Sequence, residues 1–340
     1  MTHDITVIGS NMMELTTDID RMPKLGETVS APSFHMAFGG KGANQAYAAA
    51  QLGSSVAMIS KVGSDSLGQA YLEHFQQSGI DITGVSVGNQ SNGVAPCFIQ
   101  GNMNSIIVVQ GANSELTPDV LDQYTDLIKS YKMVILQQEI SLATDYRAID
   151  LAEQFHVPVM LNPAPANDNV DLEHITKCEF YSPNETELGR LTHLPVESID
   201  QIKDAAHSLV DQGVKNVIVT IGSRGALWVC ADHEELIPSY KVNAVDSIGA
   251  GDSFVGAFAH YYTNGEDIPT ALRHANAYAA VTVTMSGSQT SYPSAAELPQ
   301  LQEQLGITVD PTQLATHHHK QCAVPHQALS PPIFPMWQMP

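Results

Sequence analysis

A glycine-rich turn with an adjacent acidic residue occurs in AVDSIGAGDSFVGAF, residues 244–258. Two glycines flank Ala250, and the pattern predicts a helix that begins at about Gly251. Backbone N–H groups at such a helix start, aligned with the helix dipole, form an anion hole able to hold a transferring phosphoryl group. Asp252 would lie beside that anion and could accept a proton from an attacking hydroxyl. The alternative is that Asp252 only caps the helix.

A second glycine-rich turn occurs in FGGKGANQAYAAAQLG, residues 38–53, before an alanine-rich helical pattern. It has neither the GxxxxGK[ST] spacing of a Walker P-loop nor GxGxxG. Lys41 and Asn44 are its polar side chains and could hold a ligand. The alternative is a tight turn that carries a solvated lysine.

Two further segments follow predicted strands. In SPNETELGRL (182–191) acidic residues begin a helix, which either stabilises the dipole or places Asn184 and Glu187 near Mg²⁺ and phosphates, through water. VTIGSRGALW (219–228) is strand, glycine-containing turn and strand again, either an ordinary hairpin turn or a loop around a nucleotide.

The elements that must position these residues alternate along the chain. Short β-branched runs predict strands at 5–9, 56–62, 133–137, 157–162, 179–183 and 216–222. Helical patterns occupy 42–52, 66–77, 118–130, 141–155, 199–212, 251–263 and 268–284. Such alternation predicts an α/β fold, a doubly wound and mainly parallel sheet covered on both faces. Ligands then bind beyond the carboxyl ends of the strands.

Two stretches break the alternation. Residues 11–37 and 91–110 alternate polar and apolar residues without a helix, so we expect a small separate sheet that acts as a lid over the active-site edge. The predicted domain spans 1–310. Residues 311–340, rich in proline and histidine, predict a flexible tail.

The charge balance excludes several classes of partner. Lys and Arg total 15 against 36 Asp and Glu, a net charge of −21, which argues against nucleic acid and anionic membrane surfaces. The N-terminal segment has no signal-peptide pattern, and no stretch predicts a membrane span. We therefore expect a cytoplasmic protein that acts on small molecules.

Taken together, the motifs resemble the ribokinase (PfkB-type) sugar kinases over about residues 4–310. GGKGANQA and D-x-x-GAGD-x-F are the family's signatures, with NPAP at 162–165, PNETE at 183–187 and TIGSRG at 220–225 between them. The resemblance implies a ribokinase-like fold with a β-sheet lid and ATP-dependent phosphorylation of a sugar hydroxyl. Asp252 would be the base, with Gly249, Ala250 and Gly251 as the anion hole.

The resemblance also assigns binding residues. Those implied to hold the sugar are Gly40, Lys41, Gly42, Asn44 and Glu139, in addition to Asp252. Those matching nucleotide positions are Asn184, Thr220, Gly222, Ser223, Gly225 and Asn276. Glu187 matches the acidic residue tied to Mg²⁺. A monovalent cation, K⁺, would order the anion hole from positions matching Asp246, Ile248, Thr282, Met285, Gly287 and Ser291. The family further implies a homodimer.

The loop GSNMMEL (9–15) bears on the substrate. Ribokinases often carry Asn and Asp where this chain has Met12 and Glu14. Methionine packs against a methylene but pairs poorly with a 2-hydroxyl. GSNM, RMPKLGET, FAHYY and SQTSYPS resemble the 2-deoxyribose kinases, which predicts phosphorylation of the 5-hydroxyl of 2-deoxy-D-ribose. Glu14 departs from both subfamilies. The alternatives are ribokinase activity on D-ribose and a non-catalytic sugar-binding regulator.

Overall fold

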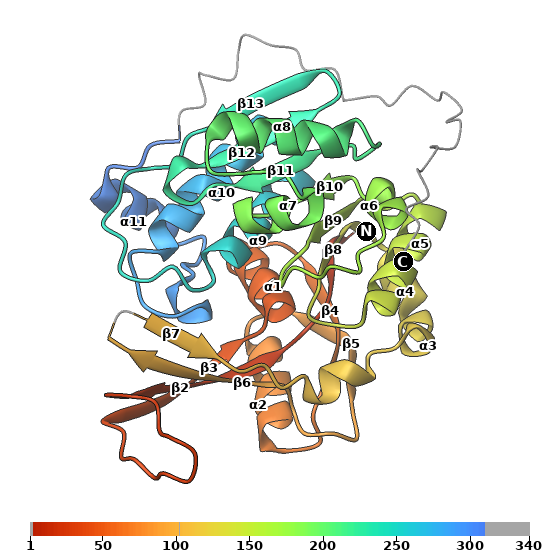
Figure 1. Cartoon of the computed structure of the whole chain (residues 1–340). Helices are drawn as coiled ribbons and strands as arrows, with labels where there is room; N and C mark the ends of the chain where they lie inside the picture. The colour runs from red at the N-terminus through yellow and green to blue at the C-terminus, as the bar shows by residue number, and fades with distance from the viewer. Residues whose placement is uncertain (1–2, 102, 310–340) are drawn as a thin grey trace, which may run out of the picture.

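A nine-stranded sheet forms the centre of the computed structural model, which describes residues 3–101 and 103–309 (Figure 1). The strand order is β13-β12-β11-β10-β9-β8-β1-β4-β5, parallel from β5 to β11 and antiparallel at β12 and β13. The strands are β1 (His3–Ile8), β4 (Val56–Val62), β5 (Asp81–Val87), β8 (Tyr131–Gln137), β9 (Val159–Asn162), β10 (Phe180–Tyr181), β11 (Val217–Thr220), β12 (Ala226–Cys230) and β13 (His233–Ile237). The predicted doubly wound, mainly parallel sheet is confirmed.

Helices cover both faces of this sheet because its central strands are apolar on both sides. In β8, Met133 and Ile135 pack into one core while Val134 and Leu136 pack into the other, as the two-residue period of a strand requires. The first core includes α1 (Lys41–Gln51), α2 (Ser66–Gln77), α9 (Ala250–Thr263), α10 (Ile268–Thr282) and α11 (Leu298–Leu305). The second includes α3 (Pro118–Leu121), α4 (Thr125–Lys129), α5 (Leu142–Gln154), α6 (Leu172–Lys177), α7 (Glu185–Thr192) and α8 (Ile199–Val210).

A second sheet of four strands projects from one end of the molecule (Figure 1). Its order is β3-β2-β6-β7, formed by β2 (Met12–Asp18), β3 (Ser33–Gly39), β6 (Val94–Gln100) and β7 (Met103–Ile106). These strands come from the two stretches that interrupted the alternation, so the predicted lid sheet is confirmed. The predicted tail, 311–340, lies outside the described residues, and the domain limit at 310 stays a prediction.

Several local predictions were incomplete. The helix predicted over 118–130 is broken, because a 3₁₀ turn, Asp122–Tyr124, separates α3 from α4. That turn contains no fully buried residue, and only Tyr124 packs, partly buried, against the second core. The prediction also omitted β5, a half-buried edge strand, the antiparallel strand β13, and the short helices α6 and α11.

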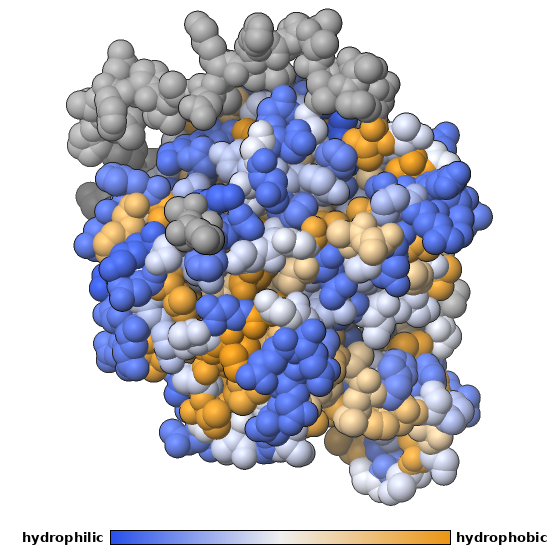
Figure 2. Space-filling view, turned by 180° about the vertical axis from the view of Figure 1, so that it is seen from behind, coloured by the Kyte–Doolittle hydropathy of each residue, from blue (hydrophilic) through white to orange (hydrophobic). Residues whose placement is uncertain are grey.

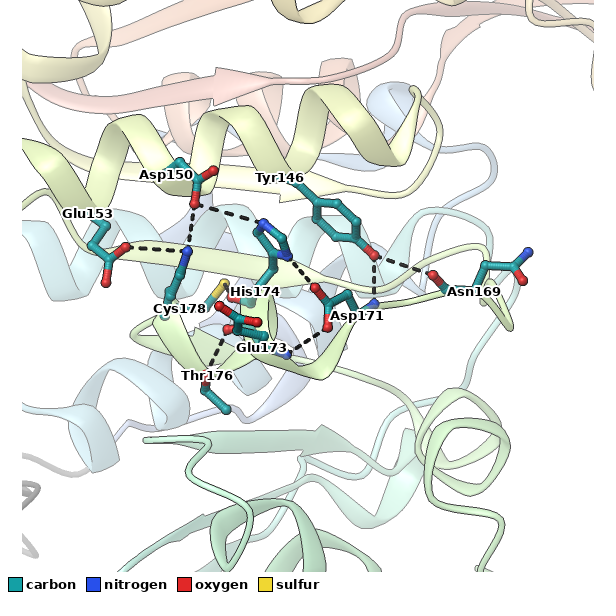
Figure 3. A network of polar contacts seen from close by, with 10 residues as sticks. Tyr146, Asp150, Glu153, Asn169, Asp171, Glu173, His174, Thr176 and Cys178 are labelled. Atoms are coloured by element: carbon teal, nitrogen blue, oxygen red, sulfur yellow. Dashed lines mark hydrogen bonds and ion pairs between the residues drawn. The ribbon is translucent and has the colours of Figure 1, made fainter. Parts of the chain in front are cut away.

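Polar contacts join the helices on the outer surface. On α6, Lys177 Nζ lies 2.7 Å from Asp150 Oδ1 of α5. The His174 ring stacks on Tyr146 of α5 at 4.1 Å (Figure 3). Seen from behind, the molecule is mostly hydrophilic, with separate apolar patches (Figure 2). No helix within the described residues is long and apolar enough to cross a membrane.

Candidate active site

Asp252 lies in the first turn of α9 and is only 6% exposed. Each of its carboxylate oxygens accepts an amide N–H from α1. Asn44 Nδ2 donates to Oδ2 at 3.0 Å, and Gln45 Nε2 donates to Oδ1 at 3.0 Å. The two glycine-rich turns, separated by about two hundred residues in the chain, therefore meet at this carboxylate. The N-cap of α9 is Gly249 and no side-chain cap hydrogen bond forms there, so the alternative that Asp252 only caps the helix is not supported.

The start of α9 presents free backbone donors. Within the described chain, the N–H groups of Gly251 and Asp252 have no protein acceptor, whereas the N–H of Ala250 donates to Ser247 O at 3.2 Å. Gly249 has a φ of +73°, and a Cβ there would lie 2.5 Å from Tyr292 Oη. A Cβ at Gly251 would meet open space. The turn thus keeps a gap beside two unpaired N–H groups, as an anion hole requires.

Lys41 stands at the start of α1 and faces the same carboxylate. The negative charge of Asp252 is the main influence on Lys41 and raises its pKa, with help from Glu139 and Glu187 and against the cost of burial. The Glu139 carboxylate is fixed next to the start of α1, because its Oε2 accepts the Ser10 hydroxyl at 2.5 Å and the Lys41 backbone N–H at 2.8 Å. Burial raises the pKa of Glu139, and the charge of Lys41 opposes that rise.

Met12 and Glu14 lie at the base of the lid on β2. Met12 is buried, and its carbonyl accepts Tyr71 Oη at 3.3 Å. The Glu14 carboxylate folds against Gly39, where an added Cβ would lie 2.2 Å from Glu14 Oε1, and Ser288 Oγ donates to it at 3.3 Å. Burial, assisted by the nearby carboxylates of Asp252, Asp246 and Glu139, raises the pKa of Glu14 to about 7. The longer Glu14 side chain is thus accommodated beside a residue that has none.

A cavity of about 210 Å³ opens at the carboxyl edge of the sheet. It brings together seven of the predicted site residues, namely Lys41, Asn184, Glu187, Thr220, Gly249, Gly251 and Asp252, and it is also lined by Asn162, Ala164, Ser182, Ser247 and Val255. Predicted sugar, metal, nucleotide and anion-hole positions therefore share one space.

The predicted nucleotide positions lie on neighbouring loops. Asn184 and Glu187 form a reciprocal capping box at the start of α7, in which Asn184 Oδ1 accepts the Glu187 N–H at 2.9 Å and Glu187 Oε2 accepts the Asn184 N–H at 2.8 Å. Burial raises the pKa of Glu187. Asn184 also forms an isolated parallel bridge with Thr220, which ends β11.

The turn after β11 holds the other nucleotide positions. Gly222 and Ser223 lie in a short 3₁₀ turn, and Gly225, at φ +109°, packs where a Cβ would lie 2.0 Å from Ile237 O. Asn276 donates through Nδ2 to Ile237 O at 3.1 Å, so it holds the end of β13. Gly222, Ser223, Gly225 and Asn276 are not among the residues that line the cavity.

The positions expected for a monovalent cation form a hydrogen-bonded loop next to the anion hole. Asp246 Oδ1 accepts the Ile248 N–H at 3.0 Å, and Asp246 Oδ2 accepts the Gly287 N–H at 2.9 Å. Thr282 lies nearby, with Oγ1 3.1 Å from Ser253 Oγ, while the N–H of Met285 donates to Thr282 O at 3.1 Å. The last of these positions, Ser291, makes no hydrogen bond to Asp246, and its Oγ donates to Ser288 O at 2.8 Å. Within the described residues no group of three or more His, Cys, Asp or Glu side chains could hold a metal.

A larger hollow of about 560 Å³ lies at the opposite, amino edge of the sheet, lined in part by the segments that lead into β9, β10 and β11. Its lysines are paired, since Lys177 contacts Asp150 and Lys215 contacts Glu179 at 3.2 Å. Among the described residues that line this hollow, no lysine is left unpaired to bind a substrate phosphate. The smaller cavity is the candidate active site.

Comparison with known proteins identifies the family. The model described as "pfkB family carbohydrate kinase" matches residues 2–295. The chain belongs to this family. It is 46% identical to the deoxyribokinase of Salmonella typhi over 89% of this chain and 99% of that protein. It is 38% identical to the ribokinase of Bacillus subtilis, over 88% of this chain and 99% of that protein. The solved structure of Arabidopsis thaliana ribokinase complexed with ribose and ATP superposes with a TM-score of 0.84 and 32% identity, covering 91% of this chain and all of that one. These matches confirm the predicted family and the predicted enzyme class, a carbohydrate kinase.

Sequence reasoning missed the polar groups behind the pfkB signatures. Gln45 and Gln289 lie within the quoted segments GGKGANQA and SQTSYPS, yet neither was assigned a role. Ser10 and Asn162 were missed in the same way. The only available signal was that these polar residues lie next to predicted strand ends and glycine turns.

Proposed function

We propose that this pfkB kinase transfers the γ-phosphoryl group of ATP to the 5-hydroxyl of 2-deoxy-D-ribose. The observation that carries the proposal is the buried Asp252 carboxylate beside two unpaired backbone N–H groups, in a cavity that also reaches Asn184 and Thr220. The 46% identity to a deoxyribokinase and the Met12 position favour 2-deoxyribose over ribose.

In this proposal Asp252 accepts the proton of the 5-hydroxyl as that oxygen attacks the γ-phosphorus. The new bond joins the sugar oxygen to phosphorus, and the bond from phosphorus to the β–γ bridging oxygen breaks, releasing ADP. The N–H groups of Gly251 and Asp252 stabilise charge on the phosphoryl oxygens, with Lys41 nearby. A carboxylate is a weak base for an alcohol, so the geometry contributes more than basicity.

The sugar would lie between the lid and α9. We assign Gly40, Lys41, Gly42, Asn44 and Glu139 to its hydroxyls, with Met12 against the C2 methylene and Glu14 toward the remaining hydroxyls. Nucleotide binding is assigned to Asn184, Thr220, Gly222, Ser223, Gly225 and Asn276.

Two ions belong to the proposal. Glu187 fits a water-mediated contact to Mg²⁺, because Oε2 accepts the Asn184 N–H and no described residue donates a hydrogen bond to Oε1. Bound Mg²⁺ would offset charge on the ATP phosphates. The carboxylate of Asp246 and backbone carbonyls of the 282–291 segment fit K⁺, which would order the loop that leads into the anion hole.

A homodimer formed through the lid is also proposed. Phe34 and Met36 of β3 are 59% and 57% exposed, and Ile106 of β7 is 53% exposed. The lid is at lower right in Figure 2 and shows apolar side chains on that face. Exposed apolar groups gathered on one small sheet are typical of an interface. The expected cytoplasmic location stays a prediction.

The test is steady-state ADP release with 2-deoxyribose and with ribose, in Mg²⁺ and K⁺, for the wild type and Met12→Asn. We expect a higher kcat/KM for 2-deoxyribose in the wild type and a shift toward ribose in Met12→Asn. An apolar contact rejects an added hydroxyl by at most about 10²-fold, so the preference should be modest. Preference for ribose in the wild type would support ribokinase activity, and sugar binding without ADP release would support the non-catalytic regulator.

A further inference from the structure

The segment SQTSYPS contributes a buried glutamine to the active site. Gln289 is 4% exposed, lies in a short 3₁₀ turn after α10, and donates through Nε2 to Asn44 Oδ1 at 2.9 Å. Asn44 in turn donates through Nδ2 to Asp252 Oδ2. One amide therefore holds another against the carboxylate.

A third side chain, His74 on α2, extends this chain of hydrogen bonds beyond Gln289. His74 Nε2 lies 2.6 Å from Gln289 Oε1. Because that oxygen can only accept, the proton of a neutral His74 must be on Nε2. Every donor then points the same way, from His74 through Gln289 and Asn44 to Asp252, and the orientation of each amide depends on the one before it.

His74 is itself clamped between aromatic rings. It stacks on Phe38 at 3.9 Å with an interplanar angle of 1°, and on Tyr47 at 5.2 Å. Phe38 belongs to lid strand β3 and Tyr47 to α1. The His74 ring thus lies where the lid, α1 and α2 meet.

A second, independent chain reaches the other oxygen of Asp252. Gln137 Nε2 donates to Gln45 Oε1 at 2.8 Å, and Gln45 donates to Asp252 Oδ1. Both carboxylate oxygens are thus fixed, and the two hydrogen-bond chains together set the plane of the carboxylate. Loss of the chain through Gln289 leaves the chain through Gln45 in place, which allows the first chain to be tested in a folded protein.

We propose that Gln289 and His74 are positioning residues for the phosphoryl transfer, acting through Asn44 to hold the Asp252 carboxylate in its reactive orientation. This inference rests on the proposed function of Asp252 as the base. Neither residue needs to contact the sugar or ATP. Their contribution is to prevent the Asn44 amide from turning over and presenting its oxygen to the carboxylate.

The experiment measures kcat, KM for both substrates and thermal unfolding of Gln289→Leu, Gln289→Glu and His74→Phe. Misplacement of a reacting group costs up to about 10²-fold, so we expect kcat to fall about tenfold in Gln289→Leu and His74→Phe. Gln289→Glu should fall further, because a carboxylate attracts Asn44 Nδ2 and turns Asn44 Oδ1 toward Asp252. His74→Phe keeps the stacking on Phe38, and His74→Gln, which restores a donor, should recover part of the loss.

The matched control is His260→Phe. His260 is also partly buried and hydrogen-bonded, 2.8 Å from Ser54 Oγ, and although it lies on α9 with Asp252, no hydrogen bond among the described residues joins the two side chains. It should lose stability without losing kcat. The proposal is overturned if kcat of the Gln289 and His74 variants stays within about twofold of wild type, or if it falls only as it does in His260→Phe. Asp252→Asn distinguishes failure of the proposed function from failure of this inference. If that variant retains turnover, the assignment of Asp252 as base is wrong. If it is inactive while the Gln289 variants are unaffected, only the positioning role of Gln289 and His74 is refuted.

Discussion

At the scale of single residues, the site is organised around carboxylates held by neutral donors. Asp252 receives two amide N–H groups, and Glu139 receives a hydroxyl and a backbone N–H. Amides hold a carboxylate in a fixed direction without transferring a proton to it. A base that must face one hydroxyl needs that directional control more than it needs a raised pKa.

Replacement of Asp252 by Asn should therefore lower kcat while sparing sugar affinity. The amide keeps the size of the side chain but cannot accept the proton. We expect a loss of about 10²- to 10⁴-fold in kcat, measured by steady-state ADP release. Sugar binding measured by calorimetry should change little. Turnover close to wild type would refute the assignment of Asp252 as base.

Glu14 should make the stability of the protein depend on pH. Its folded pKa, about 7, is raised above the ordinary value of 4.5, so folding favours the protonated form. Its contribution is complete below about pH 4.5 and is lost as the pH rises through about 7. The melting temperature of the wild type relative to Glu14→Gln should therefore fall between about pH 5 and pH 8. A constant difference across that range would contradict the shift.

At the scale of elements, the turn before α9 contains two glycines that serve different purposes. Gly249 has a left-handed φ and no room for a Cβ beside Tyr292 and Ser288. Gly251 has room, but that room is the space beside the unpaired N–H groups. The first glycine is required by the backbone and the second by the ligand.

Alanine at each position should separate these roles. Gly249→Ala should destabilise the fold by about 1–3 kcal/mol through the strained φ and the clash, and should also lower kcat. Gly251→Ala should unfold at nearly the wild-type temperature and lose activity, because its methyl group occupies the position of a phosphoryl oxygen. Calorimetric melting and ADP release on both variants test this. Equal loss of stability in the two variants would contradict it.

At the scale of the whole molecule, the lid is a separate sheet that leaves apolar side chains in water. Burying Phe34 and Met36 against a second copy would remove this exposed area, at about 25 cal/mol per Å² of apolar surface. The lid also carries Glu14 at its base, so an interface there would act on the sugar site through β2 and β3.

Phe34→Ser with Met36→Ser should therefore shift the protein toward the monomer and raise KM for the sugar. Sedimentation velocity at several protein concentrations measures the first effect, and steady-state kinetics the second. Val87→Ser on β5 is the control, since Val87 is similarly exposed, at 55%, but lies outside the lid. A wild type that sediments as a monomer throughout would refute the dimer.

The sequence by itself determined the fold class, the lid and the signature turns, because these depend on local patterns. Strand runs such as 133–137, the glycines around Lys41 and Ala250, and the interrupted alternation at 11–37 are each visible within a short window. Elements such as β5 and α11 were missed because few of their side chains are buried, which leaves a weak pattern.

Only the tertiary structure decided which polar side chains meet. Gln289 and Asn44 lie 245 residues apart, and Gln45 and Asp252 lie 207 apart, so no local pattern predicts either hydrogen bond. A glutamine in a loop belongs to no periodic pattern from which its hydrogen-bond partner could be predicted. Asn276, which the resemblance matches to the nucleotide side, also donates to the carbonyl of Ile237, 39 residues away, a contact that no local pattern predicts. Side-chain hydrogen bonds depend on distances of about 3 Å, which long-range packing alone establishes.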